Sequence, residues 1–460
     1  MNKFVSLFLM IAAIFIVIGV VSDDSDAAIG DEFESGDFRY VVISNENVSV
    51  LEYFGNLPHI DIPDTVTYDN NEYKIVELNN DFTTYMSDAI TSIHLPKYLD
   101  YFGEYLLDSF DSLETITVSE DNIRFYAEDG VLFEDDGYDL CLIVCPVKKE
   151  GSYVVPDGVT SIKDYAFENC KRLTSITIPA SVSDIDDSSV FYGTYVLANI
   201  IVSENNPTYS SRDGVLYDDV TGTLITYPLG KIGTTYTVKD GTIRIGDYSF
   251  FENRNLTKVI LPESVTHIES GAFENSSIME IDLPDTLEHI GDYAFYSSDI
   301  RKISIPGSIK NLDHTFKECY GLKEVTLEEG VETLFYTFMD CYALESISIP
   351  STVTDITGAF ENCTMLRSIT VNEENLFYRT VDGVLFNKDG TELILYPSNR
   401  SESEYTIPNG VVTIIGNAFI QCVNIRTLTV AASVTNFDEI GLSQFPHLET
   451  IIVEDGNDHR

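Results

Sequence analysis

The sequence predicts a repeat solenoid, in which short segments stack coil upon coil around a shared apolar core. Three features predict this class: a six-residue apolar signature at near-constant spacing, a proline that ends many copies, and a phenylalanine that recurs in the second half of the unit. Tyr and Phe are abundant, at 27 and 26 residues, while Trp is absent. This imbalance is expected when one short motif is copied many times.

The signature is L-x-x-I-x-I, with aliphatic residues substituting for one another, and it occurs twelve times. Between Leu256 and Leu366 the copies start 22 residues apart, and elsewhere 23 or 24, apart from three long steps of 60, 59 and 59 residues. Such regular spacing excludes a chain of unrelated globular domains. The first residues of the copies are Ile90, Leu113, Leu173, Leu197, Leu256, Ile278, Ile300, Leu322, Leu344, Leu366, Ile425 and Leu448.

Each unit predicts one β-strand and one compact turn or short helix. In LTSITIP, Leu173, Ile176 and Ile178 alternate with polar residues, as in a strand with one buried face. Pro179 ends this strand, because proline cannot donate to a β-ladder. The other half of a unit reads VTSIKDYAFENC, and its Phe recurs along the chain. These are Phe167, Phe250, Phe273, Phe295, Phe316, Phe338, Phe360 and Phe419.

The three long steps share a second motif, DGVL(F/Y), followed by a polar turn and an apolar stretch that ends in proline. Apolar segments around a Gly- and Asp-rich turn are a hairpin signal. We therefore expect three inserted β-hairpins that protrude from their coils, near residues 119–155, 203–238 and 372–407. The motif copies begin at Asp129, Asp213 and Asp382.

The first 27 residues are predicted to be a signal peptide, with Lys3, an apolar run from Phe4 to Val21, and a cleavage site before Ala28. The alternative is an uncleaved membrane anchor, since this run is just long enough to span a bilayer. Either places the rest of the chain outside the cytoplasm. Residues 28–85 are expected to form a β cap and the first coils, with a capping hairpin over 38–53, and residues 86–460 the solenoid.

Composition excludes several classes of protein. Hydrophobic residues make up 44% of the chain, too many for a disordered acidic tail. A formal charge of −48 excludes nucleic acid as a partner and disfavours anionic membranes. Membrane contact is expected only through an uncleaved N-terminal segment.

No pattern of catalytic residues is present: the sequence lacks H-E-x-x-H, C-x-x-C, G-x-S-x-G and a nucleotide-binding glycine loop. Five cysteines share one repeat position and could bind metal or cross-link, but small buried side chains that fill a tight turn are the favoured explanation. Acidic turns could suggest Ca²⁺, although they do not converge enough ligands. We expect no enzyme, no metal and no cofactor. The five cysteines are Cys170, Cys319, Cys341, Cys363 and Cys422.

With these motifs assembled, the chain resembles the BspA-type leucine-rich-repeat family of secreted and surface proteins. The resemblance rests on the unit IPxxVxxIxxxAFxxCxxLxxI and on NPxYxSxDGVLYxxxxxxLIxYP, best matched from Asn206 to Tyr209 with Asp213-Gly214. It implies a curved right-handed solenoid with parallel strands on the concave face and short turns or helices on the convex side. It also implies a non-enzymatic adhesin or recognition surface.

Two surfaces are candidates for binding. The first is a column of hydroxyls on the predicted concave face, although Thr also simply suits exposed strands. The second is a column of tyrosines before the Ala-Phe pair, although packing between coils is an alternative role. The hydroxyl column comprises Thr117, Thr177, Ser304, Thr326, Ser348, Thr370 and Thr429, and the tyrosine column Tyr165, Tyr248, Tyr293 and Tyr336.

The sequence therefore predicts an acidic, secreted or surface-attached leucine-rich-repeat protein that binds extracellular proteins of a host or neighbouring cell. The alternative is a structural envelope protein that assembles with itself or binds cell-surface glycans, since unpaired strand edges invite association.

Overall fold

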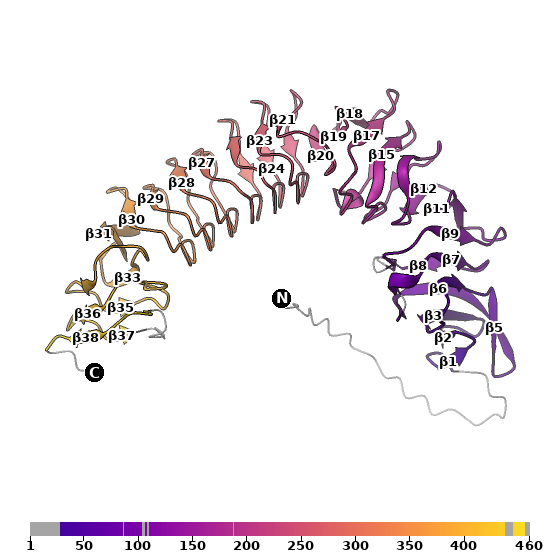
Figure 1. Cartoon of the computed structure of the whole chain (residues 1–460), viewed down its shortest axis with the longest axis horizontal. Helices are drawn as coiled ribbons and strands as arrows, with labels where there is room; N and C mark the ends of the chain where they lie inside the picture. Colours follow the sequence, from indigo (N-terminus) through magenta and orange to yellow (C-terminus); the bar gives the residue numbers. More distant parts are fainter. Residues whose placement is uncertain are drawn as a thin grey trace.

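The computed structural model describes residues 28–85, 87–103, 106–107, 110–186, 188–437 and 445–455, without the side chains of residues 81 and 188. The predicted signal peptide or anchor lies outside these residues. The described chain is a curved stack of β coils (Figure 1), which confirms the repeat solenoid. Its helical content, within those ranges, is two 3-10 turns, η1 (Ser87–Ala89) and η2 (Ser188–Phe191). No helix found there is long and apolar enough to span a membrane.

The L-x-x-I-x-I copies form parallel strands, as predicted, and we call their stack the strand ladder. In β27 the apolar residues Ile303 and Ile305 are buried while Lys302 and Ser304 are exposed. The ladder comprises β4 (His59–Asp61), β7 (Ser92–Leu95), β9 (Thr115–Val118), β13 (Glu150–Val154), β15 (Arg172–Ile178), β17 (Asn199–Val202), β21 (Thr235–Thr237), β23 (Lys258–Ile260), β25 (Glu280–Asp282), β27 (Lys302–Ile305), β28 (Glu324–Leu327), β29 (Ser346–Ile349), β30 (Ser368–Val371), β34 (Glu404–Thr406), β36 (Thr427–Val430) and β38 (Thr450–Val453).

Two-residue strands follow the proline turns and form a second parallel ladder. The isoleucines Ile245 and Ile268 of two neighbouring strands are fully buried. The strands are β8 (Tyr101–Phe102), β14 (Ser161–Ile162), β16 (Asp184–Ile185), β22 (Arg244–Ile245), β24 (His267–Ile268), β26 (His289–Ile290), β35 (Thr413–Ile414) and β37 (Asn436–Phe437).

The segment around each repeated phenylalanine is a compact turn rather than a helix, and these turns also stack; we call their stack the turn ladder. The N–H of Phe250 donates to the carbonyl of Ala272 in the next coil at 2.8 Å, and the N–H of Phe273 to Ala294 at 2.7 Å. The phenylalanine rings lie over one another inside the solenoid, with Phe273 and Phe295 centred 5.0 Å apart and nearly parallel. Each coil thus contacts the next through backbone hydrogen bonds and through its largest side chain.

The strand ladder lies on the outer side of the arc, so the predicted concave position of the strands is wrong. In Figure 1 the labels β7, β9, β27 to β30, β36 and β38 follow the outer side, with β8, β24 and β37 further in. The strand ladder is broken between β25 and β27 and between β28 and β29. Turn-to-turn hydrogen bonds continue over the same coils. Where the strand ladder is broken and the turn ladder stays bonded, the coils are spaced more widely on the strand side. The stack then curves so that the strand side is convex.

Each insert is a three-stranded antiparallel meander that joins the second ladder. The antiparallel pairing agrees with the hairpin prediction. Protrusion is wrong, because Val131, Leu132 and Phe133 of the middle strand are fully buried. Such a strand is apolar on both faces and must be covered on both. The strands are β10 (Phe125–Glu128), β11 (Val131–Asp135), β12 (Leu140–Val144), β18 (Tyr209–Arg212), β19 (Val215–Asp218), β20 (Thr223–Thr226), β31 (Tyr378–Val381), β32 (Val384–Asn387) and β33 (Glu392–Leu395).

An asparagine anchors the start of every insert to the preceding coil. The side-chain amide of Asn206 donates to the carbonyls of Pro179 and Val182, at 2.9 and 2.8 Å. Its side-chain oxygen accepts the N–H groups of Thr208 and Tyr209. Asn122 and Asn375 make the same four bonds in the other two inserts.

The N-terminal end is a mixed sheet that contains the hairpin expected over residues 38–53. Here β2 (Phe38–Val42) pairs antiparallel with β1 (Glu32–Ser35) and β3 (Asn47–Tyr53). Next to β3 lies β6 (Asn71–Thr84), which also pairs with β5 (Thr65–Tyr68) and with β8. The pairing of β6 with β8 joins this sheet to the second ladder.

Candidate functional site

Residues of the predicted hydroxyl column lie opposite one another on neighbouring strands, but on the outer face. Ser304 lies opposite Thr326 on the neighbouring strand, and Ser348 opposite Thr370. These four side chains and Thr117 are exposed, whereas Thr177 and Thr429 are half-buried. Ion pairs such as Lys302–Glu324, at 2.9 Å, lie along the same strands. The column is therefore a mixed polar surface on the convex side.

The predicted tyrosine column lies on the turn ladder, and each member has a left-handed backbone. The φ angles of Tyr165, Tyr248, Tyr293 and Tyr336 are 58°, 50°, 58° and 49°. A bulky residue rarely adopts this conformation, so the fold must hold it in place. His314 takes the same position one coil after Tyr293, and their rings stack at 4.9 Å.

The structure shows how this column packs and how much of it is exposed. A Cβ placed on Gly271 would lie 2.3 Å from the ring of Tyr248, and one on Gly358 at the same distance from Tyr336. The rings of these two tyrosines thus lie over the glycine of the next coil. Tyr248 is nevertheless 49% exposed and Tyr293 38% exposed. The column packs between coils and still offers ring surface to solvent.

Carboxylates lie between these rings along the same side of the solenoid. Glu318 accepts hydrogen bonds from the hydroxyls of Tyr296 and Tyr320, at 2.8 and 2.7 Å. Burial, with help from the charge on Glu252, raises the pKa of Glu274 to about 7. We call this aromatic and acidic surface of the turn ladder the inner face.

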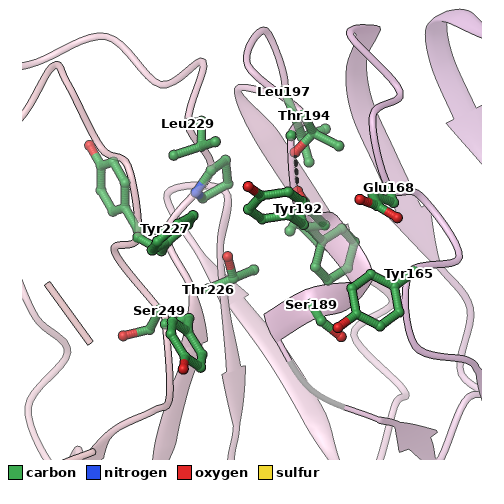
Figure 2. A pocket seen from close by; sticks show the side chains of 16 residues that line it. Tyr165, Glu168, Ser189, Tyr192, Thr194, Leu197, Thr226, Tyr227, Leu229 and Ser249 are labelled. Atoms are coloured by element: carbon green, nitrogen blue, oxygen red, sulfur yellow. Dashed lines mark hydrogen bonds between the residues drawn. The ribbon is translucent and has the colours of Figure 1, made fainter. Parts of the chain in front are cut away.

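The second insert interrupts the turn ladder and leaves a cavity of about 360 Å³ (Figure 2). In place of a full turn the insert supplies Tyr227-Pro228. The N–H of Tyr227 donates to the carbonyl of Ser249 at 2.8 Å, but Pro228 has no N–H to donate. The walls come from the turns around Phe191 and Phe251, from residues 226–229 of the insert, and from Tyr165.

Two contacts lie at or next to the residues that line this cavity. The rings of Tyr192 and Phe251 are 5.5 Å apart, and the hydroxyl of Tyr195 donates to Glu252 at 2.9 Å. Burial raises the pKa of the Tyr192 phenol. Three nearby carboxylates raise it further, those of Glu252, Glu168 and Glu274. The cavity is therefore aromatic in its walls and negative in its potential.

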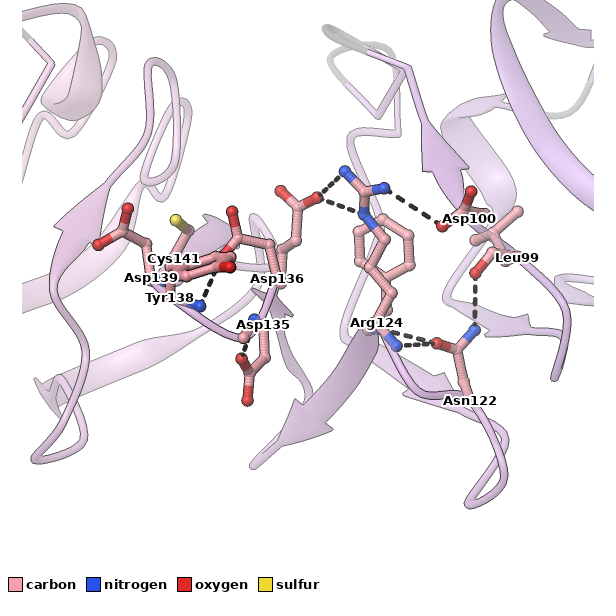
Figure 3. Close-up of polar contacts among 12 residues, drawn as sticks. Leu99, Asp100, Asn122, Arg124, Asp135, Asp136, Tyr138, Asp139 and Cys141 are labelled. Carbon is pink, nitrogen blue, oxygen red and sulfur yellow. Dashed lines mark hydrogen bonds and ion pairs between the residues drawn. The ribbon is translucent and has the colours of Figure 1, made fainter.

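Different side chains lie beside the other two inserts. A cavity of about 310 Å³ beside the first insert is lined in part by the chain's own Arg124. This guanidinium binds Glu134 at 2.6 Å and Asp100 at 3.2 Å (Figure 3). Beside the third insert, the amide of Asn417 donates to Glu361 at 3.0 Å, from one turn to the preceding one.

The cysteine column packs inside the solenoid. All seven cysteines are buried and unpaired. The thiols of Cys319, Cys341 and Cys363 donate to phenylalanine carbonyls one coil earlier, at 3.0 to 3.2 Å. Ser276 holds the same position and donates to Phe273 at 2.7 Å. This supports the packing explanation. Among the described residues, no group of three His, Cys, Asp or Glu side chains is placed to hold a metal ion.

The cavity beside the second insert was missed by our reading of the sequence, although a signal for it exists. The inserts end in Cys-Pro or Tyr-Pro where other coils have an Ala-Phe turn. Each pair makes one turn-ladder bond to the next coil through the residue before proline, namely Cys145, Tyr227 and Tyr396. The substitution of proline for a donating residue marks the places where the turn ladder opens.

Comparison with known proteins supports the repeat assignment. Residues 149–212, 234–335, 334–388 and 395–459, more than half of the chain, match the model of the BspA type leucine-rich-repeat region in six copies. No curated protein matches the chain. The crystal structure of a leucine-rich repeat protein from Eubacterium ventriosum is similar, with 22% identity, a TM-score of 0.52, and coverage of 74% of this chain and 90% of that one.

Two further structures are similar at lower TM-scores. A leucine-rich cell surface protein from Faecalibacterium prausnitzii has 22% identity and a TM-score of 0.44, covering 74% of this chain and 95% of its own. The pneumococcal vaccine antigen PcpA has 17% identity and a TM-score of 0.46, covering 93% and 100%.

Proposed function

The chain belongs to the BspA-type leucine-rich-repeat family, and from that premise we propose that it is a secreted or surface-attached, non-enzymatic scaffold that binds extracellular proteins as an adhesin or recognition surface. The fold supports this proposal, because a solenoid presents a long, rigid surface and contributes no enclosed catalytic centre of its own. The apolar N-terminal run from Phe4 to Val21 supports export.

The observation that carries the proposal is the exposed aromatic surface of the inner face. Tyr192, Tyr248, Tyr293, Tyr320 and Tyr342 are 38–49% exposed and lie on the turns of successive parts of the solenoid. Rigid aromatic side chains supply large contact area at little entropic cost, which is why binding surfaces use them. Large exposed apolar groups gathered on one side of a protein mark an interaction site.

The charge of the chain limits the kinds of protein that can be its partner. With a formal charge of −48, the protein attracts a basic surface and repels an acidic one. Carboxylates such as Glu318 lie directly among the tyrosines. We therefore expect a protein partner with a basic patch, whose association is fastest at low salt.

A binding assay with paired variants tests this function. The purified protein is used to capture extracellular-matrix and cell-surface proteins at physiological salt, and the best partner is then titrated. We expect the double variant Tyr248→Ser and Tyr293→Ser to weaken binding at least tenfold. The matched change on the outer face, Thr326→Ala and Thr370→Ala, should alter it less than twofold. No saturable partner, or a loss confined to the outer-face variant, contradicts the inner face as the binding surface.

The alternative, a structural envelope protein that self-assembles or binds glycans, has one observation in its favour. On β38 the side chains of Ile451 and Ile452 are 47% and 48% exposed. Apolar side chains on an edge strand favour pairing with another chain. A monomer in light scattering at high protein concentration removes self-assembly.

A further inference from the structure

The cavity beside the second insert has the size and walls of a ligand site. At about 360 Å³ it falls within the range of roughly 300–1,000 Å³ usual for pockets that enclose small ligands. The rings of Tyr192, Tyr248 and Phe251 line it, and those of Tyr192 and Phe251 are 5.5 Å apart. Figure 2 shows Tyr192 facing Thr226 and Leu229 across the space. It is a preformed aromatic recess on the surface to which we assign binding.

The electrostatics of the recess select a cation. Glu168 lines it, and Glu252 directly follows the lining residue Phe251 and accepts a hydrogen bond from the hydroxyl of Tyr195. Burial raises the pKa of the Tyr192 phenol, and the charges of both carboxylates raise it further. None of the residues that line the recess is Lys or Arg. A cation over an aromatic ring is attracted by the negative face of the ring, and it is held more tightly when it also meets a carboxylate in a site that excludes water. An anionic or purely apolar group gains neither contribution.

The cavity beside the first insert also combines an aromatic ring with carboxylates, and there a cation of the chain itself contacts them. There Arg124 lies 5.9 Å from the ring of Phe125 and bonds to Glu134 and Asp100. Counting from the anchoring asparagine, the second insert has Thr208 where the first has Arg124. The first cavity is thus partly lined by an internal arginine, whereas no Lys or Arg lines the second, and Thr208 is not one of its lining residues.

We propose that the cavity beside the second insert binds the arginine or lysine side chain of a basic segment in a partner protein. The aliphatic part of that side chain packs against Leu229 and Phe251, and the charged end meets the ring of Tyr192 and the carboxylate of Glu252. The proposal deepens the proposed function, on which it rests, by naming the chemical group that the inner face recognises.

Titration with single-cation peptides tests this site without knowledge of the partner. The probes are acetyl-Gly-Gly-Arg-Gly-Gly-amide and the same peptide with citrulline, which keeps the shape of arginine and removes its charge. Isothermal titration of the whole protein at 150 mM salt (a condition of roughly 8 Å screening length) should show saturable one-to-one binding of the arginine peptide. We expect the citrulline peptide to bind at least tenfold more weakly. Equal binding of the two, or no binding of either, overturns the proposal.

Single substitutions in and next to the cavity separate its contribution from the general acidity of the surface. Tyr192→Leu leaves the net charge unchanged and should weaken the arginine peptide at least fivefold, and Glu252→Gln at least threefold. The control Tyr138→Leu alters a tyrosine that is 94% exposed in the turn between β11 and β12, outside the inner face, and should stay within twofold. Circular dichroism checks that each variant is folded. If Tyr192→Leu binds as the unaltered protein does, the cavity is not the site.

The outcome also distinguishes this inference from the proposed function. If a captured partner binds equally well to Tyr192→Leu and Glu252→Gln, the scaffold function stands. The cavity is then not where that partner binds. Failure to capture any partner removes the scaffold function, while the peptide titration still decides whether the recess binds a cation.

Discussion

Replacing Phe316 by alanine is expected to lower the free energy of unfolding by about 3–5 kcal/mol, the usual range for a buried phenylalanine. Its side chain is fully buried, and its ring lies 5.2 Å from Phe295 and 5.8 Å from Phe338. The cavity left behind would interrupt the ring stack at the centre of the solenoid. Because each coil contacts mainly its neighbours, the two halves of the stack should then unfold at different denaturant concentrations.

Urea denaturation followed by far-ultraviolet circular dichroism measures this effect. Tyr320→Ala is the control, since it removes an aromatic side chain of similar size from the same coil that is 48% exposed. We expect the control to cost less than about 1 kcal/mol, as surface substitutions generally do. A loss of similar size for both variants would mean that the phenylalanine stack does not hold the coils together.

Replacing Asn375 by alanine should cost about 3 kcal/mol, because four backbone groups, two buried and two partly buried, lose their partner together. The amide donates to the carbonyls of Pro350 and Val353, both at 2.9 Å, and its oxygen accepts the N–H groups of Phe377 and Tyr378. Asn375 itself is fully buried. A buried polar group left unpaired costs about 1–3 kcal/mol, and partial relaxation of the insert offsets part of that sum.

The comparison for this variant is Asn424→Ala. Asn424 is half-buried, and its side chain donates to the carbonyl of Arg400 at 2.7 Å. Loss of such a bond is expected to cost about 1 kcal/mol. The same denaturation experiment measures both variants. If Asn375→Ala is no more destabilising than Asn424→Ala, the asparagine does not anchor the third insert.

The repeat and the residues of its core could be predicted from the sequence, because the same positions are buried in coil after coil. Leu256, Leu322 and Leu344 begin copies of the signature, and all three are fully buried. Proline marks strand ends for a reason that does not depend on the rest of the fold. This periodicity is a local property of the sequence, so the core positions can be predicted without knowledge of distant contacts.

The direction of curvature could not be predicted, because it depends on small differences between opposite ladders. Breaks between β25 and β27 and between β28 and β29 open the strand side. No single residue type encodes such a difference in spacing. The hydroxyl register was therefore predicted correctly, as with Ser304 opposite Thr326, while its concave position was wrong.

The depth of the inserts and the cavity beside the second one also escaped the sequence analysis, for a related reason. The run Val131-Leu132-Phe133 is apolar without alternation, which indicates burial on both faces, but the Asp-Gly turn before it suggested a free hairpin. The cavity needs Tyr165, Tyr192, Tyr227 and Phe251 to meet from separate coils. A sequence motif shows each of these segments alone and not the space between them.

Hydrogen exchange of the unaltered protein tests most directly the central claim, that the inserts are built into one continuous stack. The amides of β11, β19 and β32 each lie between two bonded strands. We expect them to exchange as slowly as those of β15, which lies inside the strand ladder. Exchange of these three strands at the rate of the exposed turns that follow them would contradict that claim.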